Sequence, residues 1–159
     1  MNSLVAYYSR TGTTRTVAEA LADALNADTE AITSTTTEGK GMGRLVLHTL
    51  LKTRAEISPM TKDPSSYDLV VVGTPVWAGN MSSPIRTYIE KNKDAFRNVA
   101  FFCTYGGSRS EKALKSMESL CGKTAVGTLD ILERDVKSGE YAERVKRFAT
   151  TLLEVPSAQ

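Results

Sequence analysis

Short apolar runs alternate with amphipathic helical stretches along most of this chain, and this rhythm limits its fold more than any other feature. Two of the runs, Leu69–Val72 and Val99–Phe102, are continuously apolar rather than alternating. Strands of this kind have both faces covered, as in a parallel sheet that lies between two layers of helices. The pattern therefore predicts an α/β domain with a doubly wound parallel sheet.

The expected elements follow from the same pattern. Five strands are predicted, over Ser3–Tyr8, Thr29–Thr33, Leu69–Thr74, Val99–Thr104 and Val126–Leu132. Among the helices between and after them, one begins at Ser83-Pro84, where proline suits a first turn, and another ends at Gly122. Residues 1–154 are predicted to form one domain, and residues 155–159 a frayed tail.

One segment breaks this rhythm. Ser34–Gly43 is rich in threonine and glycine and is predicted to be a loop, followed by a helix over Leu45–Lys52. Basic residues between Lys40 and Arg54 surround that helix. They would suit an anionic substrate if they lay near a site, whereas a run of exposed helix charges has the same appearance.

The composition excludes several classes of function. The 159 residues are 41% hydrophobic and 24% charged, with a net charge of +2, which is too small to indicate nucleic-acid binding. No apolar run approaches a membrane span, and no secretory signal is expected, because the first residues lack a basic region and reach a polar loop by Ser9. Cys103, Cys121 and the single His48 support neither a disulfide framework nor a zinc site. We therefore expect a cytoplasmic protein without a metal.

A loop of hydroxyl residues follows the first predicted strand directly. Ser9–Thr14 reads Ser-Arg-Thr-Gly-Thr-Thr, and an amphipathic helix begins at once after it. The backbone N–H groups of a first helical turn have no partner within the helix, and the helix dipole favours an anion there. The loop therefore predicts a phosphate site.

Two further loops follow the third and fourth predicted strands. Gly73–Met81 contains the only tryptophan, Trp77, in a segment expected to face solvent, and Thr104–Ser108 contains two glycines. If the strand order is 2-1-3-4-5, all three loops meet at one edge of the sheet. An aromatic plane suits stacking, and glycine backbone lets a ring approach closely. The three loops together predict a flat, phosphorylated heterocycle as the ligand.

These loops resemble those of the short-chain flavodoxins. Ser9–Thr14 is similar to the family's T/S-x-T-G-x-T phosphate motif, and the two other loops fall where the family's ring-binding loops fall. The resemblance covers essentially the whole chain. It implies a flavodoxin-like five-stranded parallel sheet of order 2-1-3-4-5 in three α/β/α layers, and non-covalently bound FMN.

The same resemblance implies which residues bind the cofactor. Trp77 would stack on one face of the ring, Tyr105 would lie against the other face or the edge, and backbone groups of the glycine-containing loops would bond its polar rim. No catalytic acid, base or nucleophile is expected. The implied set is Ser9, Arg10, Thr11, Gly12, Thr13, Thr14, Thr74, Pro75, Val76, Trp77, Ala78, Gly79, Asn80, Thr104, Tyr105, Gly106 and Gly107.

Two features depart from electron-shuttling flavodoxins. Ala78 stands where a glycine usually follows the stacking aromatic, and a positive φ costs a residue with a Cβ about 1 kcal/mol. We therefore expect less of the one-electron-reduced flavin than in a dedicated shuttle. The sequence pI near 8.5 also contrasts with the acidic flavodoxins.

Two functions remain open for an FMN protein of this kind. It would carry electrons to a redox partner protein, or it would use NAD(P)H to reduce a quinone or another small acceptor. Electron transfer is favoured because the chain has no nicotinamide-binding fingerprint. Partners are expected to be a redox protein or a small-molecule acceptor, without nucleic acid.

A rival motif lies in Cys103–Ser110, which matches the C-x5-R-S loop of cysteine-dependent phosphatases. There a thiolate attacks phosphorus while an arginine and loop amides stabilise the transferred group. Cys103 follows Phe101-Phe102, however, and burial in a strand would keep the thiol protonated. The motif also explains neither Trp77 nor the hydroxyl loop, so it is the least favoured function.

Overall fold

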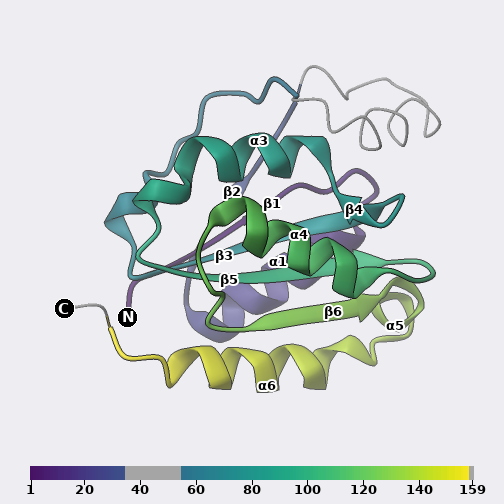
Figure 1. Ribbon diagram of the computed structural model, residues 1–159. Coiled ribbons are helices and arrows are strands. Elements are labelled where there is room, and N and C mark those ends of the chain that lie inside the picture. Colours follow the sequence, from purple (N-terminus) through teal and green to yellow (C-terminus); the bar gives the residue numbers. More distant parts are fainter. Residues whose placement is uncertain (35–54, 158–159) are drawn as a thin grey trace.

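The computed structural model describes residues 1–34 and 55–157. The predicted loop after Ser34, the predicted helix Leu45–Lys52 and the basic residues from Lys40 to Arg54 lie outside these residues. Within them, five strands form a parallel sheet in the order β2-β1-β3-β5-β6 (Figure 1). This is the order 2-1-3-4-5 of the main strands, so the predicted topology is confirmed. The strands are β1 (Ser3–Tyr7), β2 (Asp28–Ala31), β3 (Leu69–Trp77), β5 (Asn98–Tyr105) and β6 (Thr128–Leu132).

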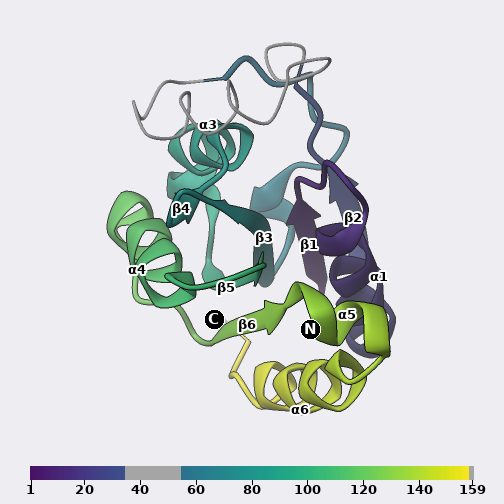
Figure 2. The ribbon, with the colours of Figure 1, turned by 90° about the vertical axis from the view of Figure 1, so that its right-hand side faces the viewer.

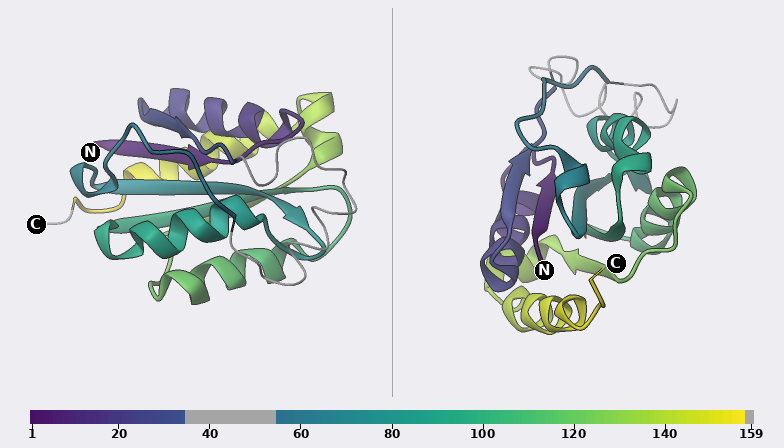
Figure 3. Two further views of the ribbon diagram at one scale, coloured as in Figure 1. Left: turned by 90° about the horizontal axis from the view of Figure 1, so that it is seen from above. Right: turned by 90° about the vertical axis from the view of Figure 1, so that its left-hand side faces the viewer.

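Helices cover both faces of the sheet. Figures 2 and 3 show α3 and α4 on one side of the strands and α1 and α6 on the other, which makes three layers. Two short 3-10 helices, η1 (Pro64–Ser66) and η2 (Lys93–Ala95), join elements of the first side. The α-helices are α1 (Thr13–Leu25), α3 (Ser83–Asn92), α4 (Ser110–Cys121), α5 (Glu133–Ser138) and α6 (Tyr141–Leu153).

The strand period of two divides the core between these layers. Along β1 and the residue after it, Leu4, Ala6 and Tyr8 pack in the cluster that includes the α3 and α4 side chains. Val5 and Tyr7 pack in the cluster that includes α1 and α6. Both faces of the central strands are therefore buried, which accounts for their continuously apolar sequence.

Gly73 lets the two central strands pack closely where they approach the ligand edge. It pairs with Tyr7 of β1 on one side and Phe102 of β5 on the other. A Cβ at Gly73 would lie 2.0 Å from the Phe102 ring, so no other residue fits without moving that ring.

Several predicted boundaries are wrong. β3 does not stop at Thr74 but continues to Trp77 and pairs with a short antiparallel strand, β4 (Asn80–Met81). The second strand begins one residue earlier than predicted and the fifth two residues later. The short helix α5 was missed, because six residues are too few to show a full apolar stripe. None of these differences changes the order of the main strands.

Polar contacts, some of them buried, hold residues 55–62 onto the sheet and α3. The Glu30 carboxylate on β2 accepts hydrogen bonds from the Thr61 N–H at 2.9 Å and the Thr61 hydroxyl at 2.7 Å. The Thr87 hydroxyl donates to the Ala55 carbonyl at 2.7 Å. Within the described residues, no helix is long and apolar enough to cross a membrane.

Two buried tyrosines on this side of the sheet make a matched test of polar burial. The Tyr67 hydroxyl donates to Asp28 at 2.7 Å, whereas the Tyr88 hydroxyl has no hydrogen-bond partner among the residues that the structure describes. We expect Tyr67→Phe to lower the free energy of unfolding by about 1 kcal/mol, and Tyr88→Phe to leave it unchanged or raise it. Urea unfolding of both variants measures this, and an equal loss in the two would contradict the assignment.

Candidate functional site

The start of α1 is built to leave its first amides available. Gly12 is the N-cap, with φ of 96°, a left-handed conformation that favours glycine. No side chain caps the helix, since the Ser9 hydroxyl instead accepts a hydrogen bond from the Gly12 N–H at 3.1 Å. The N–H groups of the first turn therefore face outward at the positive end of the helix dipole.

A buried hydrogen bond joins this loop to the end of β5. The hydroxyls of Thr14 and Thr104 lie 2.8 Å apart, and both residues are buried. The contact spans ninety positions in the sequence. It positions the first turn of α1 against the loop that follows β5.

The second loop is a hairpin rather than an irregular loop. Trp77 pairs with Asn80 across a two-residue turn, and both turn residues, Ala78 and Gly79, have positive φ, of 50° and 74°. Two successive positive φ angles are what a tight type I′ hairpin turn requires. Ala78 therefore holds a conformation that its Cβ disfavours.

Trp77 lies in a different environment from the one predicted. The sequence placed it in a solvent-facing loop, but only 6% of its surface is exposed. Its ring packs edge-on against Tyr8, with ring centroids 5.6 Å apart and an interplanar angle of 89°. Because the tryptophan ends a paired strand, the sheet carries it into the apolar cluster below α3. The expectation of an exposed Trp77 is thus wrong.

The third loop contacts the hairpin. Arg109, the N-cap of α4, has φ of 71°, and its aliphatic stem packs over Gly79. A Cβ at Gly79 would lie 2.7 Å from Arg109 Cδ. The hairpin turn and the β5–α4 loop are therefore fitted to each other.

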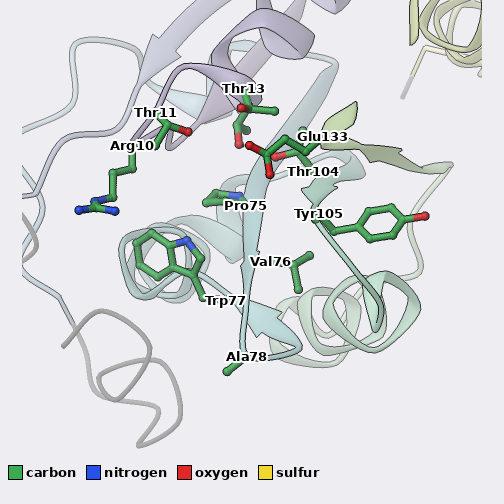
Figure 4. Close-up of a pocket in the computed structure, with 12 residues that line it drawn as sticks. Arg10, Thr11, Thr13, Pro75, Val76, Trp77, Ala78, Thr104, Tyr105 and Glu133 are labelled. Atoms are coloured by element: carbon green, nitrogen blue, oxygen red, sulfur yellow. The ribbon is translucent and has the colours of Figure 1, made fainter. Parts of the chain in front are cut away.

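The three loops enclose one pocket of about 250 Å³ at the carboxyl ends of the strands (Figure 4). Eleven of the residues predicted from the sequence line it. Hydroxyl groups gather at one end, and Trp77 and Tyr105 lie on opposite sides (Figure 4). The lining residues are Arg10, Thr11, Thr13, Thr14, Pro75, Val76, Trp77, Ala78, Thr104, Tyr105, Gly106 and Glu133.

The other predicted residues lie behind this lining. Thr74 makes two buried hydrogen bonds to Ser82, accepting from its N–H at 2.9 Å and donating to its hydroxyl at 3.0 Å. The Asn80 carbonyl oxygen accepts from the Met81 N–H at 3.0 Å and from Arg86 at 3.3 Å. These contacts hold the loops in place. The predicted residues outside the lining are Ser9, Gly12, Thr74, Gly79, Asn80 and Gly107.

Glu133 is a lining residue that sequence reasoning missed. It is the first residue of α5, directly after β6. Its position after the fifth predicted strand, at the same edge as the other loops, is the one signal that could have found it.

The structure argues against the phosphatase motif. Cys103 has no exposed surface and lies in the apolar cluster, outside the pocket lining. Burial, with a smaller effect from Asp130, raises the pKa of the Cys103 thiol to about 12. A thiol with this pKa is protonated at neutral pH and is a poor nucleophile.

The burial of both cysteines predicts chemical inertness. Burial also raises the pKa of Cys121. We expect a thiol-specific reagent at neutral pH to label neither Cys103 nor Cys121 in the native protein, and to label both after unfolding. Rapid labelling of native Cys103, together with phosphatase activity lost in Cys103→Ser, would reinstate the motif.

The strained turn gives a second test. We expect Ala78→Gly to stabilise the protein by about 1 kcal/mol, because glycine adopts positive φ without a steric cost. For a chain of this size, that is a rise in Tm of about 2 to 4 °C. Ala78→Val is the matched variant, and it should lower Tm because a β-branched residue resists this conformation more strongly. Thermal unfolding without ligand measures both, and a lower Tm for Ala78→Gly would refute the strain.

Comparisons with known proteins agree with this arrangement. Among solved structures, a flavoprotein of Lactobacillus acidophilus in complex with FMN is 22% identical, with a TM-score of 0.71 over 89% of this chain and 98% of that one. A provisionally named flavoprotein of Bacteroides uniformis is 24% identical, with a TM-score of 0.78 over 94% and 97% of the two chains. Oxidised flavodoxin 1 of Bacillus cereus is 14% identical, with a TM-score of 0.61 over 99% and 100%. At these identities the likeness shows the fold alone.

Comparison of the sequence with protein families identifies the family as well as the fold. No curated protein matches the chain. The family described as Flavodoxin, however, matches residues 2–147, which is most of the length and includes all three loops. This chain belongs to the flavodoxin family.

Proposed function

We propose that this protein binds FMN non-covalently in the three-loop pocket and transfers electrons through it. The observation that carries the proposal is the start of α1, which has no side-chain cap and opens, with its hydroxyls, on a pocket that also contains Trp77 and Tyr105. A phosphate at one end of a flat ring system matches both parts of this lining. The FMN complex of the Lactobacillus acidophilus protein, which has the same fold, supports the choice of ring.

The phosphate would lie at the first turn of α1. The amides of that turn and the hydroxyls of Thr11 and Thr13 supply donors to its oxygens, and Arg10 adds the single positive charge of the described lining. The Thr14 side chain would support this end of the pocket indirectly, because its hydroxyl is already hydrogen-bonded to Thr104. This end of the pocket therefore fits a phosphomonoester.

The ring would lie between Trp77 and the β5–α4 loop. Trp77 is packed against Tyr8 and offers a fixed aromatic wall, whereas Tyr105 is half-buried. Offset or edge-on contacts between aromatic rings contribute about 0.5 to 1.5 kcal/mol beyond their buried area. Because the Trp77 ring is already held in place, a contact between it and the flavin ring would cost little side-chain entropy on binding.

When bound, FMN supplies reversible one- and two-electron redox chemistry. The described lining residues hold and orient it; they include no cysteine or histidine that would act as a nucleophile. The pocket is smaller than most small-molecule sites, which start near roughly 300 Å³. A three-ring head would therefore extend beyond the described lining, and an exposed ring edge would suit electron exchange with a partner.

We still predict that less of the one-electron-reduced flavin accumulates in this protein than in a dedicated electron shuttle. Ala78 has a positive φ of 50°, a backbone conformation that its Cβ disfavours. A redox titration that follows the radical would measure how much accumulates.

Removal of one hydroxyl tests the phosphate end. We expect Thr13→Val, which keeps the shape of the side chain, to raise the Kd for FMN about tenfold, the value of a hydrogen bond to a charged group. The Kd for riboflavin, which has no phosphate, should stay within twofold. Thr150→Val is the matched control, because its hydroxyl bonds the Lys146 carbonyl on α6, away from the pocket. Quenching of flavin fluorescence measures all of these constants.

Two outcomes would change this proposal. A wild-type protein that binds neither flavin would refute it outright. Rapid reduction of the FMN-loaded protein by NADH or NADPH alone would favour the second function, an NAD(P)H-dependent reductase of a quinone or other small acceptor. We expect such mixing to give no rapid reduction unless a partner reductase is added.

A further inference from the structure

A carboxylate lines the same pocket as the phosphate-binding hydroxyls. Glu133 is the one acidic side chain among the described lining residues, and Figure 4 shows its carboxylate pointing toward the side of the pocket where Thr13 lies. A negative group at this point repels a phosphate, so phosphate binding alone does not explain why a carboxylate lines the pocket.

The fold holds Glu133 at this position from two sides. As the first residue of α5, it lies at the positive end of the helix dipole, where a carboxylate is favoured. Its Oε1 lies 3.5 Å from the Lys137 ammonium one turn later, and 43% of the side chain is exposed. Its Oε2 would lie 3.4 Å from a Cβ at Gly106, so the carboxylate rests on the bare backbone of the β5–α4 loop.

The chemistry of a carboxylate limits what it can bind. An ionised carboxylate only accepts hydrogen bonds, and its strongest neutral partners in a ligand are hydroxyl groups. Glu133 lies between the hydroxyl-rich end of the pocket, at Thr13, and the aromatic end, at Tyr105 (Figure 4). A ligand that carries hydroxyls between its phosphate and its ring would present donors to Glu133.

We propose that Glu133 is a specificity-determining residue that accepts a hydrogen bond from a hydroxyl of the polyol chain of the flavin. This inference rests on the proposed function, since it takes a flavin as the ligand. It assigns Glu133 a role in binding and none in electron transfer.

The alternative is that Glu133 only supports α5. Its pair with Lys137 is exposed, and such pairs contribute little to stability. If the pair were the whole role, loss of Lys137 would have the same consequences as loss of Glu133. The two variants therefore separate a ligand contact from a helix contact.

The test compares Kd values of the apoprotein for riboflavin and FMN. Glu133→Ala removes the acceptor and the charge, and Glu133→Gln removes the charge but keeps a neutral acceptor. Lys137→Gln breaks the ion pair but keeps the carboxylate. Glu143→Ala is the matched control, because Glu143 is an exposed helix carboxylate paired with Lys146 and does not line the pocket.

We expect Glu133→Ala to raise the Kd for riboflavin about tenfold, and Glu133→Gln to raise it less. At high ionic strength, where the repulsion between Glu133 and the phosphate is screened, Glu133→Ala should also bind FMN more weakly. Lys137→Gln and Glu143→Ala should match the wild type within twofold.

Two results would overturn the role of Glu133 and leave the proposed function intact. One is wild-type binding of both flavins by Glu133→Ala, including FMN at high ionic strength. The other is the same set of changes in Lys137→Gln. A wild-type protein that binds no flavin would instead defeat the proposed function itself. Circular dichroism of each variant checks that α5 and the domain remain folded.

Discussion

The parallel register of β1, β3 and β5 is the constraint on which the rest of the molecule depends. Tyr7, Gly73 and Phe102 lie side by side across these strands, so the chain leaves all three at the same edge. Close packing there requires the bare backbone of Gly73 under the Phe102 ring. The hydroxyl loop, the hairpin and the β5–α4 loop begin within a few residues of this line, and they meet in one pocket as a result.

Contacts between the loops then complete what the sheet begins. The Thr14–Thr104 hydroxyl bond joins the first loop to the third, and the Arg109 stem over Gly79 joins the third to the second. Both contacts connect residues far apart in the sequence. They also explain why part of the predicted binding set lies behind the pocket, since those residues position the loops rather than line the cavity.

Much of the fold could be predicted from the sequence because it depends on local pattern. Continuous apolar runs and amphipathic stripes identified the main strands and helices, and the hydroxyl loop and glycine loops indicated the edge that they share. The hairpin after Thr74 could not be predicted, since its tight turn places Ala78 at a positive φ that alanine disfavours. Glu133 was missed because nothing in its own neighbourhood marks it; only the position of β6 beside β5 brings it to the pocket.

The uncapped first turn of α1 is the proposed binding site for the phosphate of a flavin. The most direct measurement is an NMR titration of the ¹⁵N-labelled apoprotein with FMN and, separately, with riboflavin. We expect FMN to shift the amide signals of Gly12, Thr13, Thr14 and Arg15, and riboflavin to shift signals near Trp77 and Tyr105 while leaving those four nearly in place. Binding of FMN that leaves the four amides unmoved would contradict the claim.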